Sequence, residues 1–89
     1  MVSAPIELEK SQIMFKLARK DNWGHKYDRL EHFKRFQHLD AAIKELSKIN
    51  FILIYKKQKF TRISLNTEHK KQIIAFIEKE LPYLKGMLR

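Results

Sequence analysis

The sequence predicts a small, mainly α-helical domain with one β-hairpin, which is an α+β fold. Apolar residues recur at helical spacing before residue 50 and again after residue 66, whereas β-branched and aromatic residues fill two short runs between these segments. A chain of 89 residues, of which 44% are hydrophobic, can bury one core but not two. We therefore expect a single domain over residues 1–89, with the core and the hairpin in 1–66 and a C-terminal helix in 67–89.

The first helix is predicted over residues 4–20. Ser3 is a suitable N-cap, and Pro5 is tolerated in a first helical turn. The side of this helix expected to pack inward consists of Ile6, Ile13, Met14 and Leu17. The helix should end at a turn-type cluster formed by Asp21, Asn22, Trp23 and Gly24.

Residues 25–49 contain neither Gly nor Pro, but their apolar spacing argues against one long helix. Every third residue is apolar in the set Tyr27, Leu30, Phe33, Phe36 and Leu39. Each three-residue step in an α-helix falls about 60° short of a full turn, so this set would wind around a continuous helix into water. We therefore expect a helix, a tight turn within residues 35–38 that resets the helical phase, and a second helix over residues 39–49.

A β-hairpin is predicted next. Asn50 is a residue type that ends helices in the left-handed conformation. Residues 51–55 and 60–65 favour strands, and the polar residues 56–59 between them favour a connecting turn. The strand face that packs on the helices is expected to carry Ile52, Ile54, Ile63 and Leu65.

A last helix is predicted from residue 67, capped by Asn66 or Thr67. Its apolar side is expected to consist of Ile73, Ile74, Phe76, Ile77 and Leu81. Pro82 should kink or end this helix, because its ring removes a backbone hydrogen bond and restricts Leu81.

The charge of the chain favours a polyanionic partner. There are 19 Lys and Arg residues against 10 Asp and Glu, a formal net charge of +9. Nucleic acid is the simplest such partner, although Lys-rich surfaces also accompany life at high temperature. The absence of Cys excludes disulfides and thiolate zinc sites, and two Gly residues do not suffice for a phosphate-cradling glycine loop. We expect no enzyme activity, no cofactor and no small-molecule effector.

The sequence also bears on localisation. No apolar run approaches the ~20 residues that cross a bilayer, so no membrane partner is expected. Glu7, Glu9 and Lys10 interrupt the region where a signal peptide would be apolar. We therefore expect an unprocessed cytoplasmic protein that is associated with the nucleoid.

The order helix, helix, turn, helix and hairpin resembles the winged helix-turn-helix family. Residues 39–52 are similar to the family's recognition helix and the strand after it: a helix ends at Leu46, passes Lys48 and Asn50, and enters an aliphatic strand. The hairpin and its exit at residues 63–68 are similar to the family's wing and C-terminal helix, and the resemblance covers residues 6–81. It implies a three-helix core with a wing, double-stranded DNA binding, and a small prokaryotic-type transcriptional regulator.

The resemblance implies that the helix from Leu39 enters a major groove while the hairpin cations contact phosphates. Six phosphate contacts per subunit, from Lys34, Arg35 and the four hairpin cations, predict a log-log salt slope of about −5. The helix has no Arg on its exposed face and includes Asp40, so the commonest contact to guanine is missing. The expected DNA-binding residues are Lys34, Arg35, Gln37, His38, Ala41, Lys44, Lys48, Lys56, Lys57, Lys59 and Arg62.

Two other patterns favour ordinary structural roles. His25 and His32 with Asp28 between them suggest a metal site, but no pair of histidines has the spacing of a helical site and no Cys assists, so no metal is expected. Base stacking is conceivable for the aromatic residues, but their three-residue spacing is better explained by core packing. These aromatic residues are Trp23, Tyr27, Phe33 and Phe36.

The terminal helices carry more apolar residues than one small core needs, which favours a two-fold homodimer. The alternative is that these residues pack on each other within one chain. The predicted interface consists of Leu8, Phe15, Ile77, Leu81, Leu84 and Leu88. Two functional alternatives also remain: a winged-helix protein-interaction module or assembly subunit, which suits Asp40 and the missing Arg, and an architectural chromatin protein.

Overall fold

The computed structural model of this protein describes residues 5–88. Its α-helices are α1 (Pro5–Arg19), α2 (Leu39–Lys48) and α3 (Lys70–Glu80), and its strands are β1 (Asp28–Arg29), β2 (Ile52–Lys56) and β3 (Thr61–Leu65). Three short 3-10 turns span Leu30–Phe33, Thr67–His69 and Pro82–Leu84. The chain is therefore an α+β protein, as the sequence predicts. The predicted cap Ser3 lies outside the described residues.

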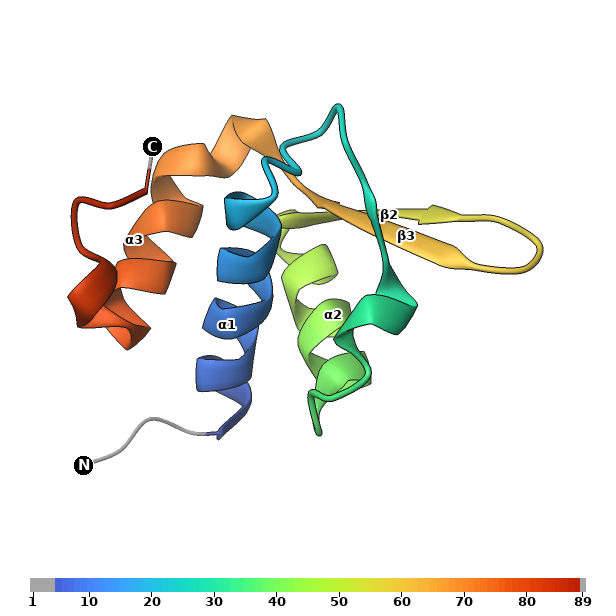
Figure 1. Ribbon diagram of the computed structural model, residues 1–89, viewed down its shortest axis with the longest axis horizontal. Coiled ribbons are helices and arrows are strands. Elements are labelled where there is room, and N and C mark those ends of the chain that lie inside the picture. The colour runs from blue at the N-terminus through green and yellow to red at the C-terminus, as the bar shows by residue number, and fades with distance from the viewer. Residues whose placement is uncertain (1–4, 89) are drawn as a thin grey trace.

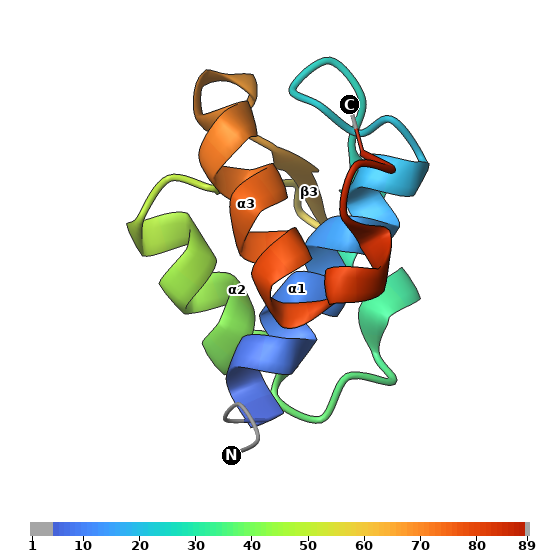
Figure 2. The same cartoon turned by 90° about the vertical axis from the view of Figure 1, so that its left-hand side faces the viewer.

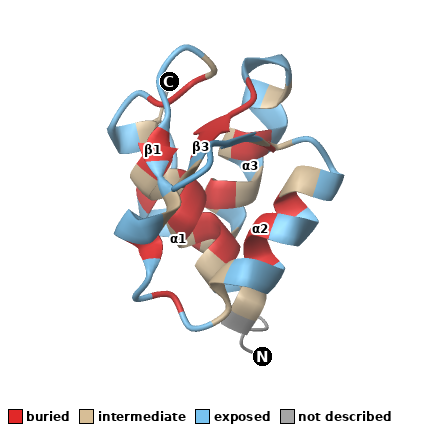
Figure 3. Ribbon diagram, turned by 90° about the vertical axis from the view of Figure 1, so that its right-hand side faces the viewer, coloured by how far each residue is buried: buried red, intermediate tan, exposed pale blue. Residues whose placement is uncertain are grey.

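Helix α1 lies between α3 and α2, and the hairpin of β2 and β3 projects away from the helices (Figure 1). Viewed from the α3 side, α3 covers α1 (Figure 2). Seen from the hairpin end, the buried residues of α2 face the interior and its exposed residues face away (Figure 3). All of these elements contribute to one core, whose fully buried large side chains include Ile13, Met14, Leu17, Phe33, Leu46, Ile63 and Ile77.

The sheet has three strands in the order β1-β3-β2, and both pairings are antiparallel. The predicted hairpin is confirmed, but Ile54 departs from expectation. Ile54 pairs with Ile63, yet it is 38% exposed while Ile63 is fully buried. The hairpin has already passed the edge of the core at Ile54, so the inward-facing positions beyond it meet solvent.

The helix predicted just after residue 25 is wrong. After residue 25 the chain forms strand β1 and then the 3-10 turn Leu30–Phe33, and residues 25–38, all of which the structure describes, contain no α-helix. Single 3-10-type hydrogen bonds continue from the Phe36 amide to the Phe33 carbonyl and from the Leu39 amide to the Phe36 carbonyl. A 3-10 helix has three residues per turn, so every third side chain lies on the same side of it. From Leu30 to Leu39 the three-residue spacing therefore follows successive turns of this kind, whereas Tyr27 precedes strand β1 and is exposed, and α2 begins after the expected break at residues 35–38.

The C-terminal segment ends its α-helix where Pro82 requires it. Helix α3 stops at Glu80, and a 3-10 turn follows over Pro82–Leu84. The side chain of Asn66 accepts a hydrogen bond from the Glu68 amide, as predicted for a cap. Asn50 has a φ of 64°, the left-handed conformation expected at the end of α2.

The predicted dimer surface needs correction. Ile77, Leu81 and Leu84 are 0%, 6% and 3% exposed, because α1 and α3 pack on each other within one chain. The alternative of intramolecular packing therefore holds for these three side chains. Leu8 is exposed, while Phe15 and Leu88 are half-buried against the core. No helix among residues 5–88 combines the length and the apolar character that a bilayer crossing requires.

Candidate nucleic-acid interface

The hairpin presents two faces that carry different side chains. Because side chains alternate along a strand, Lys56 and Thr61 lie on the same face as Ile63, which is the face toward the core. Tyr55 and Arg62 are paired on the opposite face. We call the first the α2-side face and the second the outer face.

A groove of about 410 Å³ separates the hairpin from the start of α2. Lys59 at the hairpin tip and Lys34 before α2 both line this groove, together with Asp40 and Glu31. Lys56, Lys57 and Lys59 are exposed, and none of them forms an ion pair within residues 5–88. Two predicted DNA-binding residues from distant parts of the sequence, Lys34 and Lys59, are thus brought to one groove.

The exposed stripe of α2 points directly away from the core. Ala41, Lys44 and Lys48 lie on it, opposite the buried residues Ala42, Ile43 and Leu46. Two acids also stand on this helix. The Glu45 carboxylate is bound by the buried Lys10 ammonium at 2.5 Å, so its charge is compensated from α1. Asp40 forms no ion pair within the described residues and remains an uncompensated acid beside the stripe.

His38 is held by α1 and does not extend from α2. The Glu9 carboxylate accepts hydrogen bonds from the His38 backbone amide, at 2.8 Å, and from the His38 imidazole. Burial works to raise the pKa of Glu9, but the hydrogen bonds and charge of His38 outweigh it and hold that pKa below its usual value. This contact fixes the N-terminus of α2 on α1. It also engages the His38 side chain, which the sequence predicts as a DNA contact.

Arg35 lies in a different groove from its neighbour Lys34. This second groove, of about 770 Å³, is also lined by Lys16 and Arg19 of α1 and by Gln37. The Arg35 guanidinium is 5.0 Å from the centre of the Phe36 ring. Partial burial, and then the charges of Lys20 and Arg35, lower the pKa of Lys16. The predicted DNA contacts Arg35 and Gln37 are therefore grouped with α1, although Gln37 also borders the start of α2.

The outer face of the sheet carries an aromatic and cationic surface. Register places Arg29, Arg62 and Tyr55 side by side across β1, β3 and β2. The guanidiniums of Arg29 and Arg62 lie 4.4 Å and 4.7 Å from the centre of the Phe60 ring. Tyr27 and Tyr55 have ring centres 6.2 Å apart, and they are 36% and 47% exposed.

Sequence reasoning missed most of this surface. Because no strand was expected at residues 28–29, nothing in the sequence placed Arg29 or Tyr27 beside the hairpin. The interpretation of the aromatic residues as core is correct for Trp23, Phe33 and Phe36, which are 7%, 0% and 8% exposed, and wrong for Tyr27. The available signal was that Tyr55 and Arg62 both occupy strand positions opposite in phase to the apolar Ile54 and Ile63, so that both face away from the core.

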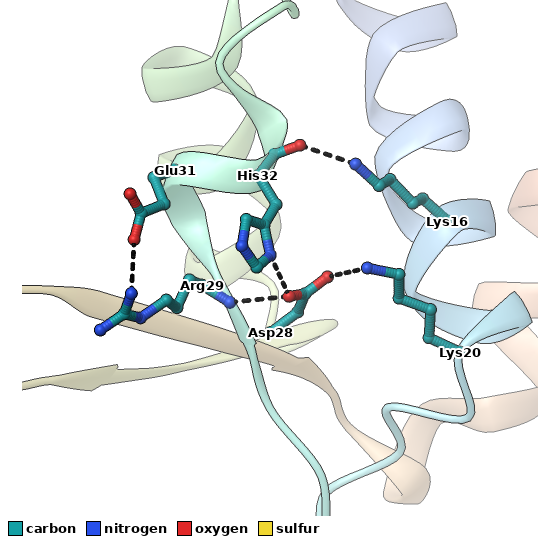
Figure 4. Close-up of polar contacts among 6 residues, drawn as sticks. All are labelled: Lys16, Lys20, Asp28, Arg29, Glu31 and His32. Carbon is teal, nitrogen blue, oxygen red and sulfur yellow. Dashed lines mark hydrogen bonds and ion pairs between the residues drawn. The ribbon is translucent and has the colours of Figure 1, made fainter.

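A buried carboxylate positions the strand that carries Arg29 (Figure 4). Asp28 is 8% exposed and accepts hydrogen bonds from Lys20, the residue that follows α1, at 3.0 Å and from the Arg29 backbone amide at 2.9 Å. Its other contact is with the His32 imidazole at 2.6 Å. Burial tends to raise the pKa of Asp28, but the bonds and charges of Lys20 and His32 lower it overall. Asp28 thereby ties β1 and the following 3-10 turn to α1.

His25 lies apart from this cluster. Its ring is 2.9 Å from the Trp23 carbonyl oxygen and 3.8 Å from the Asp21 carboxylate. Within residues 5–88, no group of three or more His, Cys, Asp or Glu side chains could hold a metal ion. The Asp28 cluster is accordingly a structural tie, in which Lys20 occupies the side of the carboxylate away from His32.

Comparison with protein families, with curated proteins and with solved structures found no match to this chain. What the protein binds must therefore be inferred from the charges, contacts and exposure of its own residues. The largest concentration of cations without an ion-pair partner in the described part of the chain is on the hairpin and α2.

Proposed function

We propose that this protein binds double-stranded DNA as a winged helix-turn-helix protein, with α2 in a major groove and the hairpin against the flanking backbone. The single observation that carries this proposal is the groove between the start of α2 and the hairpin, which Lys34 and Lys59 both line, at a helix whose exposed side carries further lysines. Cations held on a protruding hairpin and a neighbouring helix neutralise phosphates and release counterions.

The order of elements supports the same proposal. Helix α1, the 3-10 turn Leu30–Phe33, helix α2 and the hairpin follow one another as the elements of a winged helix-turn-helix domain would, with one helix of the motif reduced to a single 3-10 turn. The Lys10 and Glu9 contacts fix α2 on α1. A rigidly placed α2 is what insertion into a groove requires.

Base recognition would be limited. The stripe of α2 offers Ala41, Lys44 and Lys48, and His38 is engaged by Glu9. Ala41 can contact a thymine methyl group and Lys44 a guanine edge, whereas a bidentate arginine contact is missing from this helix. We therefore expect semi-specific binding in which DNA shape contributes to selection.

Charge reversal on the α2-side face tests the proposal. Lys56→Glu combined with Lys59→Glu should weaken binding to a duplex at least tenfold in an anisotropy titration, because two phosphate contacts become repulsive. The control is Lys71→Glu combined with Lys79→Glu on α3, which makes the same change in net charge at exposed positions away from the hairpin. If the two double variants lost affinity equally, only the net charge of the protein would matter for DNA binding, and the assignment of the interface to the hairpin would be wrong.

The salt dependence of wild-type binding gives a second readout. Five cations, namely Lys34, Lys44, Lys48, Lys56 and Lys59, predict a log-log slope of about −4 to −5 per subunit. A flat salt response, or no duplex binding at low salt, contradicts the proposal. In that case the interaction-module alternative takes its place.

A further inference from the structure

The outer face of the sheet lies on the opposite side of the strands from the α2-side face, and the two sites adjoin at Phe60, which also lines the groove of the proposed duplex interface. The outer face is distinguished from the rest of the cationic surface by exposed aromatic rings. Tyr55 is 47% exposed and Tyr27 is 36% exposed, and their ring centres are 6.2 Å apart across the sheet. The Lys57 ammonium lies 5.2 Å from the centre of the Tyr55 ring. An intact duplex cannot stack bases on these rings, because its bases already stack on each other.

Two guanidiniums converge beside these rings. Arg29 and Arg62 share the Phe60 ring, at 4.4 Å and 4.7 Å from its centre. Only one carboxylate compensates them, through an ion pair of 3.0 Å between Arg29 and Glu31 in which both side chains are 46% exposed. Exposed pairs of this kind are weak. A phosphate beside the two guanidiniums would relieve their mutual repulsion and could accept paired hydrogen bonds from either.

At the end of this face nearest the helices, the loop before β1 covers the sheet. The exposed part of the face therefore consists of Tyr27, Tyr55, Arg29 and Arg62. Ser64 is fully buried, and its hydroxyl accepts a hydrogen bond from the Gly24 amide at 2.7 Å. That contact anchors the loop before β1. The loop and the Asp28 cluster together hold Tyr27 and Arg29 against the hairpin without a ligand.

We propose that this outer face is a second nucleic-acid site, which takes single-stranded nucleic acid. Unpaired bases stack on Tyr55 and Tyr27, while Arg29 and Arg62 hold the phosphates between them. Exposed aromatic rings favour single strands because only unpaired bases offer a free face. The neighbouring cations match the charge of the strand. The site does not depend on duplex binding by the α2-side face.

The probe is a labelled oligothymidylate of about twelve nucleotides, which lies within the site sizes of known single-strand binding folds. The comparison probe is an abasic oligomer of the same length and charge, which has phosphates and no bases. Wild-type protein should bind the oligothymidylate about a hundredfold more tightly than the abasic oligomer, because each of the two stacked bases contributes about tenfold. Equal affinity for the two oligomers would overturn the proposal, as would equally effective competition by polyglutamate, which would instead point to an acidic protein partner.

Three tyrosines provide matched variants. Tyr55→Ala and Tyr27→Ala should each reduce the preference for the oligothymidylate by about tenfold, whereas Tyr55→Phe should keep it because the ring remains. Tyr83→Ala is the control, since Tyr83 is 73% exposed and lies on the C-terminal turn. The fluorescence of Trp23, which is 7% exposed, reports folding of each variant. If Tyr55→Ala does not fold, Tyr55→Leu supplies the bulk without the aromatic face.

Duplex binding separates this proposal from the preceding one. The tyrosine variants should bind duplex DNA like the wild type, and the double variant of Lys56 and Lys59 should retain the preference for bases over the abasic oligomer. Folded tyrosine variants that keep the full preference for the oligothymidylate would overturn the outer-face site even if duplex binding is confirmed. Base-dependent binding without any duplex binding would contradict only the first proposal.

Discussion

The Asp28 carboxylate and the His32 imidazole form a hydrogen bond of 2.6 Å across the junction between β1 and the 3-10 turn that follows it. The same carboxylate accepts a hydrogen bond from Lys20, directly after α1. One nearly buried acid therefore connects three elements, and it also sets the position of Arg29 on the outer face. Its removal should be felt in the stability of the whole fold.

Replacing Asp28 tests this connection. Asp28→Asn should lower the free energy of unfolding by about 2 kcal/mol, because two charge-assisted hydrogen bonds to a buried group are lost or weakened. Urea unfolding followed by Trp23 fluorescence measures the change. Asp21→Asn is the matched control: Asp21 is exposed, its φ of 60° is tolerated by Asn, and the expected loss is under about 0.5 kcal/mol. Equal losses in the two variants would contradict the role of Asp28.

The pH dependence of stability follows from the same group. The pKa of Asp28, and that of Glu9, lies below the value in the unfolded chain. The ionised carboxylates therefore stabilise the fold above about pH 4, and this contribution is lost as the pH falls through their folded pKa values. Thermal unfolding between about pH 6 and pH 2 should show a falling Tm, with a shallower fall in Asp28→Asn. Parallel curves for the two proteins would refute the assignment.

Asn50 gives a prediction about the backbone. Its φ of 64° is strained for a residue with a β-carbon, and its carbonyl accepts a hydrogen bond of 2.9 Å from the Asn66 side chain. Asn50→Ala should cost about 1 kcal/mol, because Ala avoids the left-handed region more strongly than Asn. Asn50→Gly keeps the same backbone bond and should change stability by less than about 0.5 kcal/mol. Chemical denaturation of both variants checks the order, and a less stable Gly variant would contradict the explanation.

Separate substitutions of Lys34 and Arg35 test which of the two grooves the DNA contacts. Lys34→Ala should reduce the slope of log affinity against log salt for duplex DNA by about 1, because Lys34 shares its groove with Lys59. Arg35→Ala removes the same charge and should leave the slope unchanged, because Arg35 lies with Lys16 and Arg19. A slope that changes equally in both variants would mean that the DNA also contacts the α1 groove.

The local sequence pattern was sufficient to predict an element wherever that element depends only on its own residues. The end of α1, the turn at Asn50, the hairpin and the end of α3 at Pro82 could be predicted, because turn residues, strand-forming runs and proline act within a few residues. The segment from residue 25 to 38 could not, although its three-residue spacing carried the information. Its short strand exists only because β3 offers a partner to Asp28 and Arg29.

The candidate sites divide in the same way. Composition and order along the chain already indicated a basic hairpin after a helix, and hence an anionic partner. Which cations act together depended on folding: Lys34 and Arg35 are neighbours in sequence but enter different grooves, while Arg29 and Arg62 come from distant segments and share one ring. The physical reason is one of range. Helix ends and turns arise from interactions over a few residues, and net charge follows from composition. Strand pairing and packing bring together side chains that are far apart in the chain, and their sequence positions do not show that they will be in contact.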